Sequence, residues 1–114
     1  MKSPIMYIEC KGGGIIGPAR IGRVTFSKSG KSIYYKDKCF EPLYRKGFKA
    51  NYCDKETKEQ YWISGCHKDG GDALYSTTVI IDEDAREEYW LQIRKQPKNI
   101  KVSRLRLKGK YNKS

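Results

Sequence analysis

The sequence lacks any closely spaced pair of cysteines, and it contains a single histidine, His67. Its four cysteines are spread along the chain at Cys10, Cys39, Cys53 and Cys66. Structural zinc sites usually take their ligands from close pairs, because a tight turn aims two side chains at one ion. The spacing therefore argues against a zinc site, and we expect free thiols, no metal ligands and no cofactor.

Long apolar runs are also absent, and only 38% of the residues are hydrophobic. The N-terminal run from Ile5 to Ile8 is too short for the apolar region of a signal peptide, and no stretch has the length of a membrane span. We therefore expect a cytoplasmic protein with no membrane contact. Its core has to depend on aromatic residues, which are nine Tyr, three Phe and two Trp.

Acidic residues are missing from the last part of the chain. Residues 1–93 contain 15 Lys and Arg against 13 Asp and Glu, a balance of +2, so residues 94–114 supply the other +9 of the net charge of +11. A nearly neutral body with a concentrated basic end favours a polyanionic partner such as DNA or RNA.

Alternating apolar and polar residues predict two β-hairpins. The first spans Arg20 to Tyr35, and its polar loop contains Gly30, which can adopt the positive φ that such loops need. The sequence Gly30-Lys31-Ser32 resembles the end of a phosphate-binding loop, but strand-forming residues follow it where that motif requires a helix. The second hairpin spans Phe48 to Ser64, with Asp54 starting its turn. Shorter strands are expected at 6–10 and 77–81.

The only convincing helix follows residue 81. Asp82 or Asp84 can cap its N-terminus, Asp84 and Glu87 fit a capping box, and Pro97 ends it. The predicted fold class is mainly β (α+β), a small bent antiparallel sheet or partly open barrel of about five or six strands with one C-terminal helix. We expect residues 1–97 to form a single β-rich domain with a terminal helix. Residues 98–114 would form a basic tail that either adds a strand or stays disordered until a polyanion orders it.

Basic and aromatic residues interleave between Lys31 and Lys49. Positive charge beside stacking platforms is typical of single-stranded nucleic-acid binders, although simple strand alternation with the aromatics facing inward produces the same pattern. We predict a non-catalytic module that contacts nucleic acid through this surface and the tail. The predicted nucleic-acid-binding residues are Lys36, Lys38, Tyr44, Arg45, Lys46, Lys49, Lys101, Arg104, Arg106 and Lys108.

Two alternatives remain open. One is a protein-interaction or immunity-type partner protein with no nucleic-acid role, which would use a sheet edge or the region from Trp62 to Asp72. In that region Trp62 either packs under the helix or is exposed. The other alternative is an enzyme, because Cys66, His67 and Asp69 or Asp72 could form a thiol–base–carboxylate set. Neighbours in sequence rarely face each other, so we predict no catalytic residues, and the oligomeric state stays undefined.

The motifs RIGRVTFSKSGKSIYY, YWISG, KDGGD and DEDAREEYW, read together, resemble a group of short uncharacterised bacterial cytoplasmic proteins. The similarity covers about residues 6–97 and omits the basic tail. The resemblance implies a bacterial cytoplasmic origin, and it transfers no catalytic residue to this chain.

Overall fold

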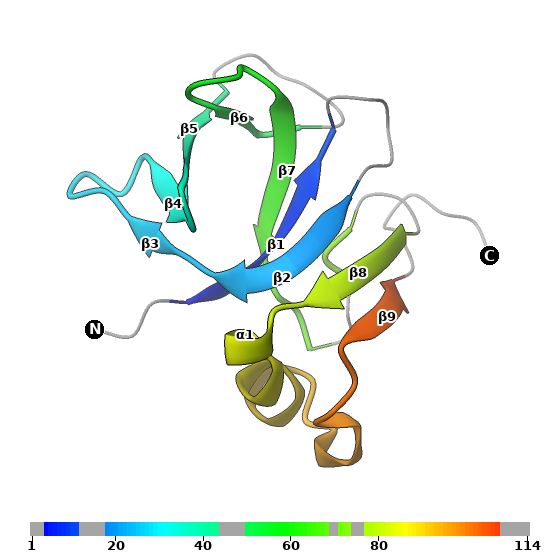
Figure 1. Ribbon diagram of the computed structural model, residues 1–114. Helices are drawn as coiled ribbons and strands as arrows, with labels where there is room; N and C mark the ends of the chain where they lie inside the picture. Colours follow the sequence, from blue (N-terminus) through cyan, green and yellow to red (C-terminus); the bar gives the residue numbers. More distant parts are fainter. Residues whose placement is uncertain (1–3, 12–17, 44–49, 69–70, 74–76, 108–114) are drawn as a thin grey trace.

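The strands of the protein form one curled sheet (Figure 1), seen in a computed structural model that describes residues 4–11, 18–43, 50–68, 71–73 and 77–107. Within these residues the sheet has nine strands in the order β3-β4-β5-β6-β7-β1-β2-β8-β9. Their bounds are β1 Ile5–Cys10, β2 Ala19–Arg23, β3 Thr25–Phe26, β4 Ile33–Tyr35, β5 Lys38–Pro42, β6 Tyr52–Asp54, β7 Gln60–Gly65, β8 Thr77–Ile81 and β9 Arg104–Leu107. The structure has more strands than the five or six expected, because several segments of only two or three residues each form a strand of their own.

The sheet is mixed, which corrects the expectation of a purely antiparallel one. β8 lies parallel to β2, with Ala19 opposite Val79 and Ile21 opposite Ile81, while all other pairs between the described strands are antiparallel. Strand alternation cannot reveal this direction, because it specifies faces and not neighbours. The predicted mainly β class with one C-terminal helix is confirmed.

The curl of the sheet follows from the junction of β2 and β3. These strands are far apart in the order of the sheet, yet Val24 alone separates them in the chain. Strands β3 to β7 therefore arch back over β1 and β2 (Figure 1) and enclose a first core. Its buried members are Ile8, Val24, Ile33, Tyr35, Phe40, Tyr61 and Ile63.

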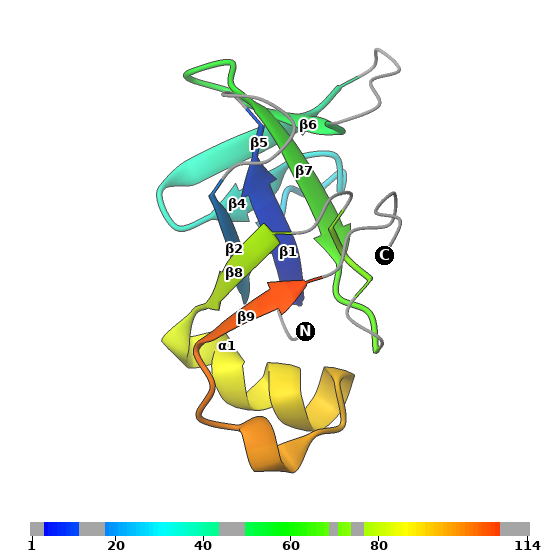
Figure 2. The ribbon, with the colours of Figure 1, turned by 90° about the vertical axis from the view of Figure 1, so that its right-hand side faces the viewer.

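A second core lies on the opposite face of β1, β2, β8 and β9, where the helical segment packs (Figure 2). This segment is α1, Glu83–Glu88, which continues as a π-helical stretch, Tyr89–Ile93, and is followed by a 3-10 turn, Pro97–Asn99. The core includes Tyr7, Ile21, Val79, Ile81, Ala85, Tyr89, Trp90 and Leu107. None of the helices in the described part of the chain has the length and apolar character needed to span a bilayer.

The start of α1 differs from the capping-box expectation. The N-cap is Asp82, and its side chain makes no capping hydrogen bond. Instead its carboxylate accepts hydrogen bonds from Arg20 and from the Tyr35 hydroxyl. Asp84 lies inside the helix rather than at its cap. A long-range ion pair has therefore replaced the local hydrogen bond that the motif predicts.

Both predicted hairpin turns are confirmed by their backbone and side-chain geometry. Gly30 has φ +77°, and its N–H donates to the carbonyl of Ser27. Asp54 Oδ1 accepts hydrogen bonds from the backbone N–H groups of Glu56 and Thr57, at 2.8 and 3.2 Å. An Asp side chain that bonds the backbone ahead of it stabilises such a turn.

Part of the C-terminal basic segment belongs to the sheet. β9 pairs with β8 in antiparallel register, and Leu107 is buried against the second core. Deleting residues 98–114 would therefore remove an edge strand and part of a core. Point substitutions are the cleaner way to examine the charges of this segment.

Candidate nucleic-acid interface

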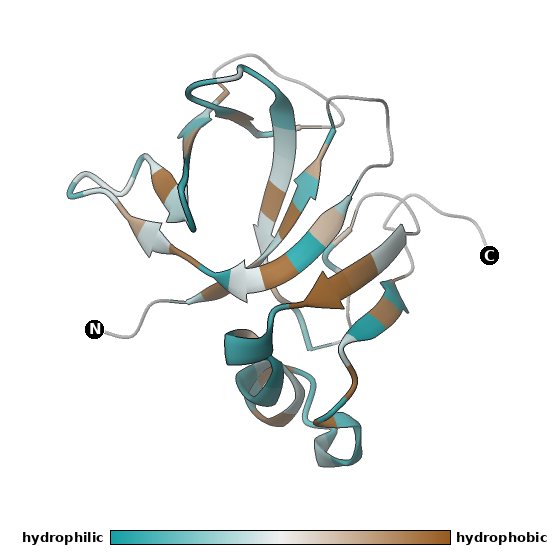
Figure 3. Cartoon of the chain, viewed as in Figure 1, coloured by the Kyte–Doolittle hydropathy of each residue, from teal (hydrophilic) through white to brown (hydrophobic). Residues whose placement is uncertain are grey.

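Alternation along β9 separates its apolar and basic side chains. Leu105 and Leu107 face the second core, whereas Arg104 and Arg106 are exposed. Figure 3 shows this strand in alternating teal and brown. Because β9 is the last strand in the order of the sheet, its arginines stand at an open edge.

Two more cations meet at Asp82, whose carboxylate is largely buried. Arg20 Nη2 lies 2.6 Å from Asp82 Oδ1, and Lys36 Nζ lies 3.8 Å from Oδ2. Both cations keep much of their surface in solvent, since their side chains are 42% and 59% exposed. Their two positive charges thus share one carboxylate.

Cross-strand register places Arg20 on the same face as the β9 arginines. Arg20 is opposite Ile80 on β8, and Ile80 is opposite Arg104 on β9. Arg106 is opposite Thr78, which is exposed. Residues directly opposite each other in a sheet point to one side. We refer to Arg20, Lys36, Arg104 and Arg106 as the basic strip.

The basic strip carries four positive charges, and within the described residues the carboxylate that ion-pairs with them is that of Asp82. Among the described residues, Arg104 and Arg106 form no ion pair. Exposed guanidinium groups without a carboxylate partner suit phosphate, which they can bind through two parallel N–H groups. Phosphate groups are therefore the kind of ligand to which the chemistry of the basic strip is suited.

The structure divides the predicted binding residues. Lys36, Arg104 and Arg106 lie in the basic strip, whereas Lys38 pairs with Asp54 at 3.6 Å in a separate pocket of about 420 Å³. Lys101 lines another pocket beside Glu83 and Glu87. The remaining five predicted residues lie outside the described part of the chain, and they are Tyr44, Arg45, Lys46, Lys49 and Lys108.

Two of the three described aromatic residues of the same region face inward. Tyr35 and Phe40 are buried in the first core, and Tyr34 is 43% exposed on the other side of β4. Tyr44 and Phe48 lie outside the described residues. Tyr34 alternates with Tyr35 along β4, so it lies on the side of that strand opposite to Tyr35, whose hydroxyl bonds Asp82 beside Arg20. None of the aromatic residues described in this region therefore adds an exposed ring to the basic strip.

Sequence reasoning missed Arg20. It lies in the predicted first hairpin, outside the interleaved basic and aromatic segment, and 62 residues separate it from Asp82. The available signal was its alternation with Ile21, which places Arg20 on the side opposite the apolar residues. Only the pairing of β2 with β8 shows which other cations share that side.

The loop after β7 brings His67 and Asp72 together but does not activate Cys66. His67 Nδ1 lies 2.8 Å from Asp72 Oδ1. Burial and the nearby Asp72 carboxylate raise the pKa of the Cys66 thiol, although Arg94 acts in the opposite direction. A nucleophilic cysteine needs the reverse, a lowered pKa and a thiolate. Asp69 lies outside the described residues, and within them no His, Cys, Asp and Glu side chains gather in a group that could hold a metal ion.

We expect Cys66 to react slowly with thiol reagents. In a variant that retains only Cys66, labelling by a disulfide reagent at neutral pH should be at least about tenfold slower than labelling of glutathione, because little thiolate is present. Stopped-flow absorbance measures both rates, and denaturant should restore the rate for the protein. A rate faster than that of glutathione would revive the cysteine-enzyme alternative.

Trp62 follows the packing alternative. Its Nε1 donates to the carbonyl of Asp72 at 2.9 Å, and its ring packs against the second core. The indole is thus part of the framework that holds the loop after β7.

Comparisons of the chain with protein-family models, with curated proteins and with solved structures found no match.

Proposed function

We propose that this protein is a non-catalytic binding module that contacts DNA or RNA through the basic strip, mainly at phosphate groups. The observation that carries the proposal is the convergence of Arg20, Lys36, Arg104 and Arg106, from three separate segments, on one face, where the ion pairs of the described residues involve Asp82 alone. The net charge of +11 adds a long-range attraction for polyanions.

Spacing along the sheet supports contacts with successive phosphates. Two residues along a strand are about 7 Å apart, and neighbouring strands are about 4.8 Å apart. Arg104 and Arg106 are therefore separated along β9, and Arg20 lies two strands away from Arg104. A row of cations with this spread can follow a nucleic-acid backbone, and such contacts carry little sequence information.

The described part of the basic strip has no exposed aromatic ring on which a base could stack, and this determines how affinity should depend on salt and on sequence. Binding should depend on counterion release rather than on base contacts, so affinity should vary little between sequences. We place this binding in the cytoplasm, since all four cysteines are free thiols, as a reducing compartment favours.

Fluorescence anisotropy with labelled single-stranded and duplex oligonucleotides tests the proposal. The logarithm of the association constant should fall linearly with the logarithm of the salt concentration, with a slope of about −3 for four phosphate contacts on a single strand. Scrambled sequences should give similar affinities. If no binding is detected even at low salt, the proposed function is wrong.

Lys36 offers a substitution that separates charge from stability. It occupies the two-residue turn between β4 and β5 with φ 54°, a conformation that favours glycine. Lys36→Gly should therefore change the free energy of unfolding by less than about 1 kcal/mol. It should nevertheless weaken oligonucleotide binding several-fold and reduce the salt slope by about 0.7. Urea unfolding and anisotropy measure the two effects, and an unchanged affinity would remove Lys36 from the interface.

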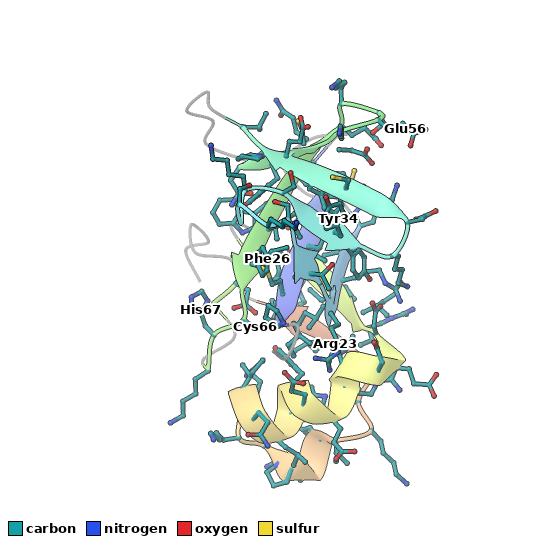
Figure 4. The ribbon with its side chains drawn as sticks, turned by 90° about the vertical axis from the view of Figure 1, so that its left-hand side faces the viewer. Arg23, Phe26, Tyr34, Glu56, Cys66 and His67 are labelled. Atoms are coloured by element: carbon teal, nitrogen blue, oxygen red, sulfur yellow. The ribbon has the colours of Figure 1, made fainter. Side chains whose placement is uncertain are left out.

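The alternative of a protein-interaction partner rests on another edge of the sheet. Phe26 on β3 and Tyr34 on β4 are 44% and 43% exposed (Figure 4). Large exposed rings near a strand edge are typical of protein-docking surfaces. A complex with a protein partner that persists at high salt and is lost in a Phe26→Ser variant would favour this function over nucleic-acid binding.

A further inference from the structure

A second polar site lies on the helix side of the sheet, away from the basic strip. His67 and Lys68 follow β7, and Arg94 and Gln96 follow the π-helical stretch. Together they line an open pocket of about 620 Å³. Figure 4 shows His67 and Cys66 at the end of β7, beside the helical segment.

His67 is held in one orientation by Asp72, whose side chain is fully buried. Asp72 Oδ1 accepts hydrogen bonds from the backbone N–H of His67 at 2.6 Å and from Nδ1 at 2.8 Å. The carbonyl of Asp72 in turn accepts from Trp62 Nε1 and from the Ser64 hydroxyl. With Nδ1 engaged, Nε2 is the ring nitrogen left to the pocket, and the imidazole is 56% exposed.

Arg94 is positioned by two aromatic rings rather than by a carboxylate. Its Nη1 donates to the Tyr89 hydroxyl at 2.9 Å, and its guanidinium carbon lies 5.8 Å from the Tyr89 ring centre and 5.5 Å from that of Trp90. Among the described residues it forms no ion pair, and its buried Nε has no hydrogen-bond partner. The charge of Arg94 is therefore pre-oriented, and its electrostatic partner nearby is the buried carboxylate of Asp72, with which it forms no direct ion pair.

The amide of Gln96 completes the set of donors. Its Oε1 accepts from Asn99 Nδ2 at 2.8 Å, which leaves its NH2 group to donate. Lys68 adds an exposed ammonium group. Asp72 contributes negative charge, but Oδ1 is engaged by His67 and Oδ2 is buried. The groups that reach the opening are thus mostly N–H donors, two of them cationic.

We propose that this pocket binds a phosphate group, either as free inorganic phosphate or as the terminal phosphate of a nucleotide or oligonucleotide. A monoester phosphate has three terminal oxygens that can accept hydrogen bonds from Lys68, Arg94 and Gln96. In its singly protonated form, its P–OH group can donate a hydrogen bond to His67 Nε2. The proposal does not rest on the proposed function, because its residues belong to other segments than the basic strip.

The single histidine makes the test direct. In two-dimensional NMR spectra the ring signals of His67 should shift in a saturable manner when inorganic phosphate is added at constant pH and ionic strength. Chloride at the same ionic strength should leave them in place. The titration of these shifts gives a dissociation constant for phosphate. Lys68→Gln, at an exposed position, and Arg94→Gln should each raise this constant at least about tenfold, whereas Arg104→Gln should leave it unchanged. Arg94→Lys, which keeps the charge, should retain part of the affinity.

Two further ligands identify the source of the phosphate. The first ligand is a short oligonucleotide with a 5′-phosphate, and the second is its 5′-hydroxyl counterpart. Tighter binding of the 5′-phosphate form than of the 5′-hydroxyl form would indicate that the pocket takes a terminal phosphate. If the 5′-phosphate oligonucleotide binds no more tightly than inorganic phosphate, the ligand is the free ion. Shifts that do not saturate, or that chloride reproduces, would overturn the proposal. So would shifts that survive both Lys68→Gln and Arg94→Gln in variants whose far-UV circular dichroism matches the parent protein.

Discussion

Replacement of Gly22 by alanine is expected to lower the free energy of unfolding by about 3 kcal/mol. A Cβ atom at this position would collide with Cε1 of the Tyr35 ring, and it would lie 2.5 Å from Asp82 Oδ2 and 2.9 Å from the Tyr35 hydroxyl. Both neighbours are held in place, since Tyr35 is buried in the first core and Asp82 binds Arg20. The methyl group can be accommodated only by displacing a ring or breaking the hydrogen bonds around Asp82.

Thermal and urea unfolding measure this loss, which should lower the midpoint temperature by roughly 10 °C or more. Gly65→Ala is the matched control, because nothing lies within 4 Å of a Cβ added there. The control should stay within about 0.5 kcal/mol of the parent protein. Equal stabilities of the two variants would mean that Tyr35 does not pack over β2.

The double variant Arg104→Gln/Arg106→Gln should bind oligonucleotides at least about tenfold more weakly, a loss of about 1.4 kcal/mol. Its salt slope on single strands should become shallower by about 1.4, because two phosphate contacts are lost. Both arginines are exposed, and the side chains that anchor β9 are Leu105 and Leu107. The fold should therefore remain intact, as far-UV circular dichroism and the unfolding midpoint can verify.

Lys55→Gln/Lys58→Gln is the control with the same change in net charge. These exposed lysines lie in the β6–β7 turn, remote from β9 in Figures 1 and 2. If binding depends on the basic strip, the control should lose much less affinity than the arginine pair. Equal losses would show that overall charge, and not this face, governs association.

Local signals account for the parts of the fold that the sequence predicts. Alternation identified most strands, and the turns at Gly30 and Asp54 could be assigned because a positive φ and a side-chain-to-backbone hydrogen bond are properties of a few adjacent residues. The helix could be placed after residue 81 for the same reason. The motif resemblance stays a prediction.

Long-range pairing accounts for what the sequence could not predict. The pattern put Tyr7 and Glu9 on one face of β1, but it could not show that both faces of this strand are covered. Glu9 is fully buried, and its carboxylate lies 2.8 Å from Lys11 Nζ. A buried carboxylate needs such partners, and the register of neighbouring strands decides whether they exist.

The candidate interface depends on the same kind of information. Lys36, Arg104 and Arg106 could be proposed from charge alone, whereas Arg20 joins them only through the pairing of β2 with β8. Lys38 and Lys101 carry the same charge but lie beside acidic residues. Charge in a sequence indicates the class of partner, and topology determines which cations can meet it.

The parallel alignment of β8 with β2 also bears on the order of assembly. Strands β1 to β7 are all present once residue 65 has been synthesised, but β2 lacks its second neighbour until residues 77–81 arrive. During that interval its outer N–H and C=O groups form an open template, which other chains could extend. Pairings between distant segments also form slowly. A nascent or truncated chain that ends before β8 should therefore be the form most prone to self-association.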